Sequence, residues 1–280
     1  MKKVGVVGCG TMGGGIAQVC AQAGYSVTVS EANEELLQKG LGAIKSILAR
    51  NVERGRMTQP DADAVIGRIK GTMKMSDFAD CDIVIEAILE NMEIKKKVFG
   101  ELDKICPPHA ILATNTSSLS ITDMAMATKR PAQVIGLHFF NPAPLMKLAE
   151  VVRTILTSDE TIQAGKKFGE SLGKTAVVAK DSPGFIVNRL AVPFLLDAVR
   201  MLESGYASRE DIDAGINMGL NHPMGPLALA DLIGLDIIVS IADAMYYELK
   251  DSQFACPPLI KKMVTAGWLG RKTKKGFYNY

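Results

Sequence analysis

The first 180 residues alternate between two spacings of apolar side chains. Short runs rich in Val, Ile and Ala are typical of buried strands, whereas apolar residues that recur every three or four positions are typical of amphipathic helices. The runs predict strands over 3–7, 26–30, 69–73, 81–88, 110–114, 134–139, 148–152 and 175–179, and the wider spacing predicts helices over 16–21, 33–56, 60–70, 93–105 and 159–172. Strands that alternate with helices favour an α/β fold with a doubly wound, mostly parallel sheet.

The pattern changes at Asp181-Ser182-Pro183-Gly184. Beyond this point the spacing is helical only, over about 184–204, 208–218, 225–250 and 257–266. Ser182 is a suitable N-cap, and Pro183 suits the first position of a helix. We therefore expect two domains, an α/β domain at 1–182 and an all-helical domain at 183–280.

A glycine-rich turn joins the first predicted strand to the first helix. Residues 8–13 follow the pattern Gly-x-Gly-x-x-Gly, which permits a tight turn, a close approach of pyrophosphate to the backbone and close helix packing. The second strand ends in an acid about 20 residues further on, where a ribose 2′-hydroxyl would be bound. This stretch predicts NAD as the cofactor, bound by Gly8, Gly10, Thr11, Met12, Gly13 and Glu31. The alternatives are an ordinary glycine loop and a solvated Glu31 that starts the next helix.

Composition narrows the class of protein. The 280 residues are 48% hydrophobic and 22% charged, which fits a globular protein with a sizeable core. The net charge of +2 gives no reason to expect nucleic acid or a membrane surface as a partner, and no apolar run is long enough to predict a membrane span. Five cysteines without a C-x-x-C pair argue against a disulfide scaffold or a zinc site. We therefore expect a cytoplasmic protein without a bound metal.

His138 is the histidine best placed for chemistry. It lies in an apolar strand that is expected to end at the ligand crevice, whereas the other two histidines lie in turn-like segments. Glu150 lies in another apolar strand, where a carboxylate is costly unless it is paired. Pairing of Glu150 with His138 would fix the tautomer of the imidazole and stabilise the imidazolium. The alternatives are a core histidine with a structural role and a solvated strand face that carries Glu150.

Further polar residues follow two of the predicted strands. Glu90 and Lys95 come after the strand at 81–88, on the edge of a doubly wound sheet that faces ligands. The segment 115–118, with the sequence Asn-Thr-Ser-Ser, follows the strand at 110–114. It would hydrogen-bond a substrate or form an ordinary loop with an N-cap.

Two other features leave their roles open. Arg50 and Arg54 lie at the far end of the helix at 33–56, where they would clamp a polyphosphate or simply suit a solvated helix end. Asn188 is a polar residue in an amphipathic helix, and spacing does not decide whether it reaches into a cleft.

Together these motifs resemble one family, the 3-hydroxyacyl-CoA dehydrogenases, and in particular its short-chain members. The segments at 138–142 and 181–189 are far more specific than the glycine motif, and the resemblance spans nearly the whole chain in the family's order. It is carried by Gly8–Gly13, Ile85-Glu86-Ala87, Asn115-Thr116-Ser117-Ser118-Leu119, His138-Phe139-Phe140-Asn141-Pro142, Asp181–Arg189, Gly225-Pro226-Leu227 and Gly276-Phe277-Tyr278.

The resemblance implies a Rossmann-type NAD-binding domain and a helical domain that binds substrate and forms a homodimer. It implies interconversion of (S)-3-hydroxybutyryl-CoA and acetoacetyl-CoA, or similar short-chain acyl-CoA pairs, by hydride transfer with NAD. His138 and Glu150 would be the catalytic dyad, and Ser117 and Asn188 would bind the reacting oxygens.

The resemblance also extends the set of binding residues. Arg50 and Arg54 would lie near coenzyme A. Glu31 stands where the family often has Asp, and Lys274 stands where many members have Gly. The residues expected near the cofactor, beyond the glycine motif, are Glu31, Glu90, Lys95, Asn115, Ser117, Asn141 and Lys274.

Two other functions stay open. A related β-hydroxyacid dehydrogenase would act on a free acid, and the arginines at 50 and 54 would then need another role. A non-catalytic, structural NAD-binding protein would share the fold, because fold alone does not determine function. The presence of both His138 and Glu150 argues against this last alternative.

Overall fold

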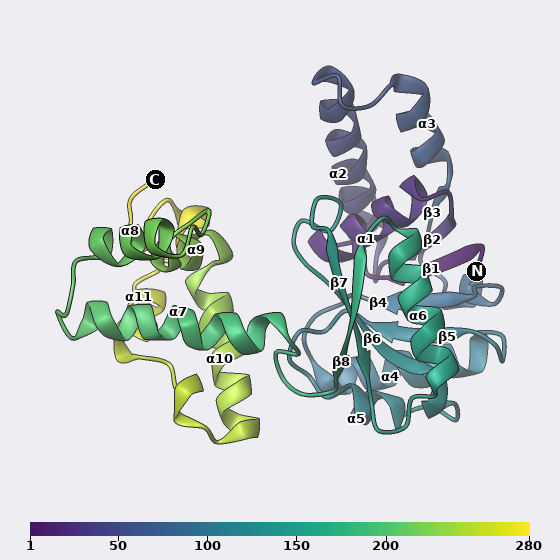
Figure 1. The fold of residues 1–280 in the computed structure, drawn as a ribbon. Coiled ribbons are helices and arrows are strands. Elements are labelled where there is room, and N and C mark those ends of the chain that lie inside the picture. The colour runs from purple at the N-terminus through teal and green to yellow at the C-terminus, as the bar shows by residue number, and fades with distance from the viewer. The chain divides into compact units, whose positions relative to one another are not determined.

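The computed structural model describes residues 1–280, and the chain divides into two compact units, Met1–Asp181 and Ser182–Tyr280 (Figure 1). The strands of the first unit are β1 (Lys3–Val7), β2 (Ser26–Ser30), β3 (Ile69–Thr72), β4 (Ile83–Glu86), β5 (Ile111–Thr114), β6 (Val134–Phe139), β7 (Leu148–Arg153) and β8 (Thr175–Lys180). Its helices are α1 (Thr11–Gln22), α2 (Glu34–Glu53), α3 (Gln59–Gly67), α4 (Met92–Ile105), α5 (Ile121–Ala125) and α6 (Asp159–Ser171), with the 3₁₀ turns η1 (Met75–Phe78) and η2 (Pro131–Gln133).

The eight strands form one sheet in the order β3-β2-β1-β4-β5-β6-β7-β8. Every neighbouring pair is parallel except β6 and β7, which confirms the doubly wound, mostly parallel sheet. The first six strands have the order typical of dinucleotide-binding folds, and the order reverses between β1 and β4. A crevice for ligands is therefore expected outside the carboxyl ends of these two strands.

Side chains alternate between the two faces of the sheet. On one face, apolar residues of β1 to β7 form a single core with residues of α1, α2, α3 and α6. On the other face, α4 contacts β5, and α5 contacts β6. The short α5 is not predicted from the sequence, because its five residues are too few for a periodic pattern.

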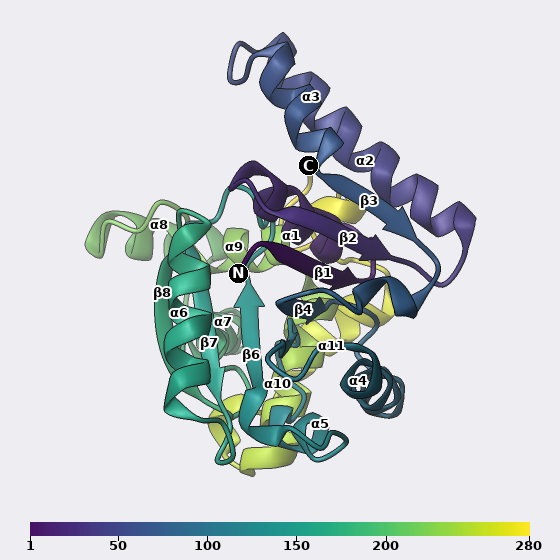
Figure 2. The same ribbon diagram turned by 90° about the vertical axis from the view of Figure 1, so that its right-hand side faces the viewer.

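Helices α2 and α3 form a hairpin that extends beyond the sheet (Figures 1 and 2). The side chain of Asn33 caps α2 by accepting a hydrogen bond from the backbone N–H of Leu36 (2.9 Å). At Gly40, α2 passes so close to the glycine turn that a Cβ atom would overlap the backbone and side chain of Cys9. Helix α2 therefore packs directly against the glycine turn.

The second unit contains only helices and short 3₁₀ turns. They are α7 (Val187–Glu203), α8 (Arg209–Gly219), α9 (Pro226–Ile233), α10 (Leu235–Leu249), η3 (Ser252–Phe254), α11 (Pro258–Thr265) and η4 (Arg271–Thr273), which enclose a core of their own. None of the helices in the protein has both the length and the apolar character needed to cross a bilayer.

Two predictions of helix bounds in this unit are wrong. The expected helix at 225–250 is two helices, because Gly234 adopts φ = 108° and interrupts the helical path. Ser182 does not cap a helix, and Pro183 is not its first residue. Gly184 and Phe185 both have positive φ (81° and 47°), so the chain turns there and α7 begins at Val187.

The buried Asp231 holds the last residues of the second unit in place. The carboxylate of Asp231 accepts hydrogen bonds from the backbone N–H groups of Phe277 and Tyr278, both at 2.9 Å. A Cβ at Gly276 would overlap this carboxylate, which explains a glycine at that position. The final segment is thus held by a buried acid rather than by a strand or helix.

The Gly40 contact leads to a stability prediction. Gly40→Ala should lower the free energy of unfolding by about 1–3 kcal/mol, because the added methyl group has no space against Cys9. Gly42→Ala is the matched control, because a Cβ there meets no atom within 4 Å. It should leave the stability unchanged or raise it by roughly 0.5–1 kcal/mol. Denaturant unfolding of both variants measures the difference, and equal effects would contradict the packing argument.

Candidate active site

Polar side chains gather on one face of the sheet, near the carboxyl ends of β4, β5 and β6. In β6, Ile135, Leu137 and Phe139 belong to the core under α1 and α6, so His138 points to the opposite face. By the same alternation, Glu86 at the end of β4 points to the face that carries His138. The register pairs this residue with Thr114 of β5, beside β6.

The antiparallel pairing of β6 and β7 places Glu150 directly opposite His138. Glu150 Oε2 lies 2.6 Å from Nδ1 of the imidazole, and the Glu150 side chain is fully buried. The ring of Phe140 packs against the imidazole at 4.6 Å between centroids. A carboxylate at Nδ1 holds the N–H on that nitrogen, which makes Nε2 the basic nitrogen of the neutral ring.

A second buried carboxylate, Glu86, organises the loops that follow β4 and β5. Glu86 Oε1 accepts hydrogen bonds from Lys95 Nζ (2.6 Å) and the Ile88 N–H (2.7 Å), and Oε2 accepts one from the Thr114 hydroxyl (2.7 Å). The Lys95 side chain is only 1% exposed. The Glu86–Lys95 pair is therefore an internal ion pair at the ligand-facing edge.

Lys95 also connects this pair to the loop at 115–118. Its ammonium lies 3.0 Å from Glu90 Oε2, and Glu90 Oε1 accepts hydrogen bonds from the Thr116 hydroxyl and the Ser117 N–H. Glu90 and Lys95 thus lie at the predicted edge. The ammonium of Lys95 is thus shared by the carboxylates of Glu86 and Glu90.

Asn115 connects the ends of β5 and β6. Its side-chain oxygen accepts a hydrogen bond from the Phe139 N–H at 2.8 Å, next to His138. Ser117 follows at the same edge and is half-buried, while Asn141 is exposed in the loop after β6. The three residues expected near the cofactor or substrate thus lie on segments that leave adjacent strand ends.

The glycine turn is tightly packed at Gly8 and Gly13 and open at Gly10. At Gly8 a Cβ would lie 2.7 Å from the Ala87 carbonyl oxygen, and at Gly13 it would overlap the Gly8 carbonyl. At Gly10, by contrast, a Cβ would meet no atom within 4 Å, and Gly10 and Thr11 are exposed. The turn therefore leaves space for a ligand beside the N-terminus of α1, which fits a pyrophosphate.

Glu31 lies beside this turn at the end of β2. Its carboxylate accepts hydrogen bonds from the backbone N–H groups of Cys9 (2.7 Å) and Ala32 (3.1 Å). Burial and the nearby Glu31 raise the pKa of the Cys9 thiol to about 11, so the thiol stays protonated at neutral pH. The residues of the turn and the half-buried carboxylate fit the diphosphate and ribose of NAD.

The remaining candidates lie farther along the chain. Arg50 and Arg54 are exposed at the end of α2, and Arg50 Nε donates a hydrogen bond to the Ser46 carbonyl at 3.2 Å. Asn188 and Lys274 belong to the second unit. Asn188 is the second residue of α7, and Lys274 is an exposed residue with φ = 58° directly after η4.

The sequence interpretation gives no role to Glu86, and it considers Thr116 only as part of the segment 115–118. The signal for Glu86 is the same as for Glu150, a single carboxylate in an otherwise apolar strand that must find a partner. Thr116 carries no such signal, because its hydroxyl is recognised only through its contact with Glu90.

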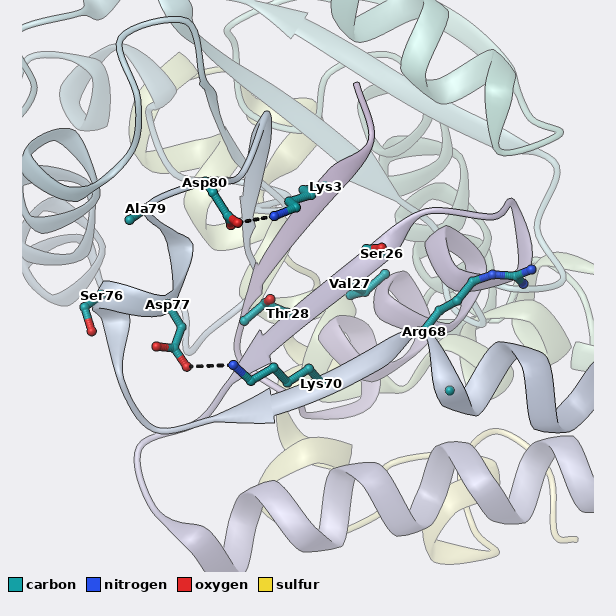
Figure 3. A pocket seen from close by; sticks show the side chains of 11 residues that line it. Lys3, Ser26, Val27, Thr28, Arg68, Lys70, Ser76, Asp77, Ala79 and Asp80 are labelled. Atoms are coloured by element: carbon teal, nitrogen blue, oxygen red, sulfur yellow. Dashed lines mark hydrogen bonds and ion pairs between the residues drawn. The ribbon is translucent and has the colours of Figure 1, made fainter.

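A hollow also lies on β1, β2 and β3, but near their amino ends (Figure 3). It is lined by the first residues of two strands, Lys3 and Ser26, and by Arg68 and Lys70. Lys3 forms an ion pair with Asp80, and Lys70 lies 3.5 Å from Asp77. This hollow is at the edge opposite the glycine turn and is not the candidate active site.

Comparison with known proteins agrees with this architecture. Residues 3–182 match the NAD binding domain of 3-hydroxyacyl-CoA dehydrogenase, and residues 184–280 match its C-terminal domain. A 3-hydroxybutyryl-CoA dehydrogenase of Bradyrhizobium diazoefficiens is 47% identical over 280 residues, which are 100% of this chain and 96% of the relative.

Two solved structures are similar over the full chain. FadB2 of M. tuberculosis has a TM-score of 0.98 and 46% identity, and (S)-3-hydroxybutyryl-CoA dehydrogenase PaaH1 of Ralstonia eutropha has a TM-score of 0.96 and 44% identity. Each comparison covers 100% of this chain and 99% of the other. With both halves matched in order, the chain belongs to the 3-hydroxyacyl-CoA dehydrogenase family.

Proposed function

We propose that this protein is an NAD-dependent dehydrogenase that interconverts (S)-3-hydroxybutyryl-CoA and acetoacetyl-CoA. The observation that carries the proposal is the buried contact between His138 and Glu150, on the sheet edge that also carries an open glycine turn. The full-length similarity to enzymes named for this substrate supports the short-chain acyl-CoA class.

His138 acts as the acid and base at the reacting oxygen. Bound NAD would supply the hydride acceptor for C3 of the hydroxyacyl thioester, and NADH would supply the donor in the reverse direction. His138 Nε2 takes the hydroxyl proton during oxidation and returns it to the carbonyl oxygen during reduction. Glu150 keeps the imidazole oriented and stabilises the imidazolium. Positioned acid–base help of this kind is worth about 10²–10⁴ in rate.

Other side chains bind the ligands around this proton transfer. The Ser117 hydroxyl and the Asn188 amide bind the reacting oxygens of the substrate. Glu90 and Lys95 hold the Ser117 loop, as their contacts suggest. The residues proposed to lie near NAD are Gly8, Gly10, Thr11, Met12, Gly13, Glu31, Glu90, Lys95, Asn115, Ser117, Asn141 and Lys274.

The proposed assembly is a homodimer formed by the helical unit, at residues 183–280. Its surface carries large exposed apolar side chains, among them Leu190, Met218 and Leu220. Sedimentation analysis tests the dimer.

The net charge of +2 offers no general attraction to nucleic acid or membranes, so neither is proposed as a partner. Five free cysteines, four of them buried, suit the reducing cytoplasm.

A substrate series tests the proposed reaction. Acetoacetyl-CoA should be reduced with NADH, followed by the loss of NADH absorbance, and acyl chains of increasing length should report the preferred size. Turnover of free acetoacetate but not of the thioester would instead indicate a β-hydroxyacid dehydrogenase. Binding of NADH without turnover of either compound would indicate a non-catalytic protein.

The dyad should behave as one unit. His138→Ala should lower kcat for acetoacetyl-CoA reduction by about 10²–10⁴, while NADH still binds. Glu150→Gln keeps the shape but removes the charge that stabilises the imidazolium, so kcat should also fall strongly. Steady-state kinetics of the double variant should show little further loss beyond His138→Ala. Additive losses, or a fully active Glu150→Gln, would mean that the pair is only structural.

Glu31 should select NADH over NADPH. Its carboxylate can accept a hydrogen bond from a ribose 2′-hydroxyl but repels a 2′-phosphate. Measured kcat/KM should therefore favour NADH, and Glu31→Gln should narrow the preference. Glu35→Gln, an exposed acid in the first turn of α2, is the matched control and should keep the wild-type ratio. Equal or better turnover with NADPH in the wild type would overturn this assignment.

Arg50 and Arg54 should affect the affinity for the thioester rather than the chemistry. Replacing either with Ala should raise KM for acetoacetyl-CoA about two- to fivefold, more at low salt, with kcat unchanged. Lys167→Ala removes an exposed cation from α6 and serves as the control. An N-acetylcysteamine thioester, which lacks the nucleotide, should be insensitive to the arginine variants. Loss of kcat at constant KM would refute the phosphate clamp.

A further inference from the structure

Lys174, between α6 and β8, is a buried cation that the proposed mechanism does not use. The residue is only 6% exposed. Its ammonium donates hydrogen bonds to the backbone carbonyls of Ala143 (2.7 Å) and Met146 (2.6 Å), and it lies 5.8 Å from the ring centroid of Phe139. Burial lowers the pKa of Lys174 below its ordinary value. A buried ammonium is costly, so these carbonyl contacts are strong constraints on the backbone that supplies them.

The two carbonyls belong to the loop Asn141–Met146, which joins β6 to β7. This loop starts three residues after His138 and ends four residues before Glu150. Its backbone is tightly turned, because the N–H groups of Leu145 and Met146 both donate to the Pro142 carbonyl. Lys174 therefore holds the connection between the two strands that carry the dyad.

The same loop packs against the cofactor-binding helix. At Gly15 of α1, a Cβ would lie 3.2 Å from the Ala143 Cβ and 3.3 Å from Pro144 Cδ. Ala143 is 2% exposed, so it is enclosed between α1 and the carbonyl contacts of Lys174. The loop thus contacts Gly15 of α1 on one side and the buried ammonium of Lys174 on the other.

We propose that Lys174 is a positioning residue: its ammonium holds the loop Asn141–Met146 against α1 and so keeps the cofactor turn and the strand of His138 in fixed relation. Lys174 touches neither the substrate nor the cofactor in this role. It acts through Ala143 and Met146, and Asn141 is the loop residue proposed to meet NAD. The effect on NADH binding rests on the proposed function, whereas the effect on the loop itself does not.

The principal test compares Lys174→Met with Lys167→Met, which makes the same change at an exposed lysine of α6. In Lys174→Met, the dissociation constant of NADH should rise about tenfold, as expected when charge-assisted hydrogen bonds are lost, while KM for acetoacetyl-CoA stays within about twofold. Amide hydrogen exchange should accelerate in residues 141–147 but not in α6. Lys174→Arg, which can donate to both carbonyls, should recover most of the affinity.

A second pair of variants tests the loop without removing a buried charge. Gly15→Ala should push on Ala143 and raise the NADH dissociation constant several-fold. Gly14→Ala, one residue earlier in α1, meets its nearest atom at 3.5 Å and should match the wild type. If Lys174→Met does not fold, this pair still tests whether displacing the loop from α1 weakens NADH binding.

The outcomes separate the two proposals. Wild-type NADH affinity and wild-type exchange in a folded Lys174→Met, or equal behaviour of the two glycine variants, would overturn the role of Lys174. A wild-type protein that neither binds NADH nor reduces acetoacetyl-CoA would overturn the proposed function instead. In that case, local exchange at 141–147 still tests whether Lys174 holds the loop.

Discussion

The antiparallel pairing of β6 with β7 is the constraint on which the site depends. In this register Glu150 faces His138, and both point to the face that also carries Glu86 and Thr114. A slip of one residue would turn Glu150 toward the apolar core under α6 and leave a buried carboxylate without its partner. The hydrophobic alternation of the two strands therefore fixes the contact between His138 and Glu150 as well as the packing, because a single register satisfies both.

The site contains two buried carboxylates with different electrostatic roles. Glu86 is balanced by the ammonium of Lys95, and its hydrogen bonds organise the loops after β4 and β5. Glu150 is instead paired with the imidazole of His138. A carboxylate paired with an ammonium holds the surrounding loops in place, whereas a carboxylate paired with an imidazole orients the ring and fixes its tautomer. The two carboxylates are both fully buried, and the partner of each determines what it does: Glu86 organises loops, and Glu150 orients an imidazole.

Strands and site residues differ in how far the sequence predicts them. β2 and β6 begin and end where the apolar runs predict, because runs bounded by polar residues are strong local signals. The helix break at Gly234 and the turn at Gly184 and Phe185 are missed, because local backbone conformation there outweighs apolar spacing. The dyad is predicted because each member is chemically costly alone. The contacts of Lys174 are not predicted, because its partners are backbone carbonyls, which every residue type carries.

The contacts of Lys95 constrain how this site can vary between relatives. One ammonium serves Glu86 within the protein and Glu90 at the loop of Ser117. Replacing the lysine alone leaves the fully buried Glu86 carboxylate without a cation, and replacing Glu86 alone leaves the buried ammonium without its fully buried carboxylate partner. A change at position 86 or 95 alone is therefore costly, whereas a joint replacement of both residues removes each charge together with its partner. The first mutational step away from this arrangement is the least accessible one.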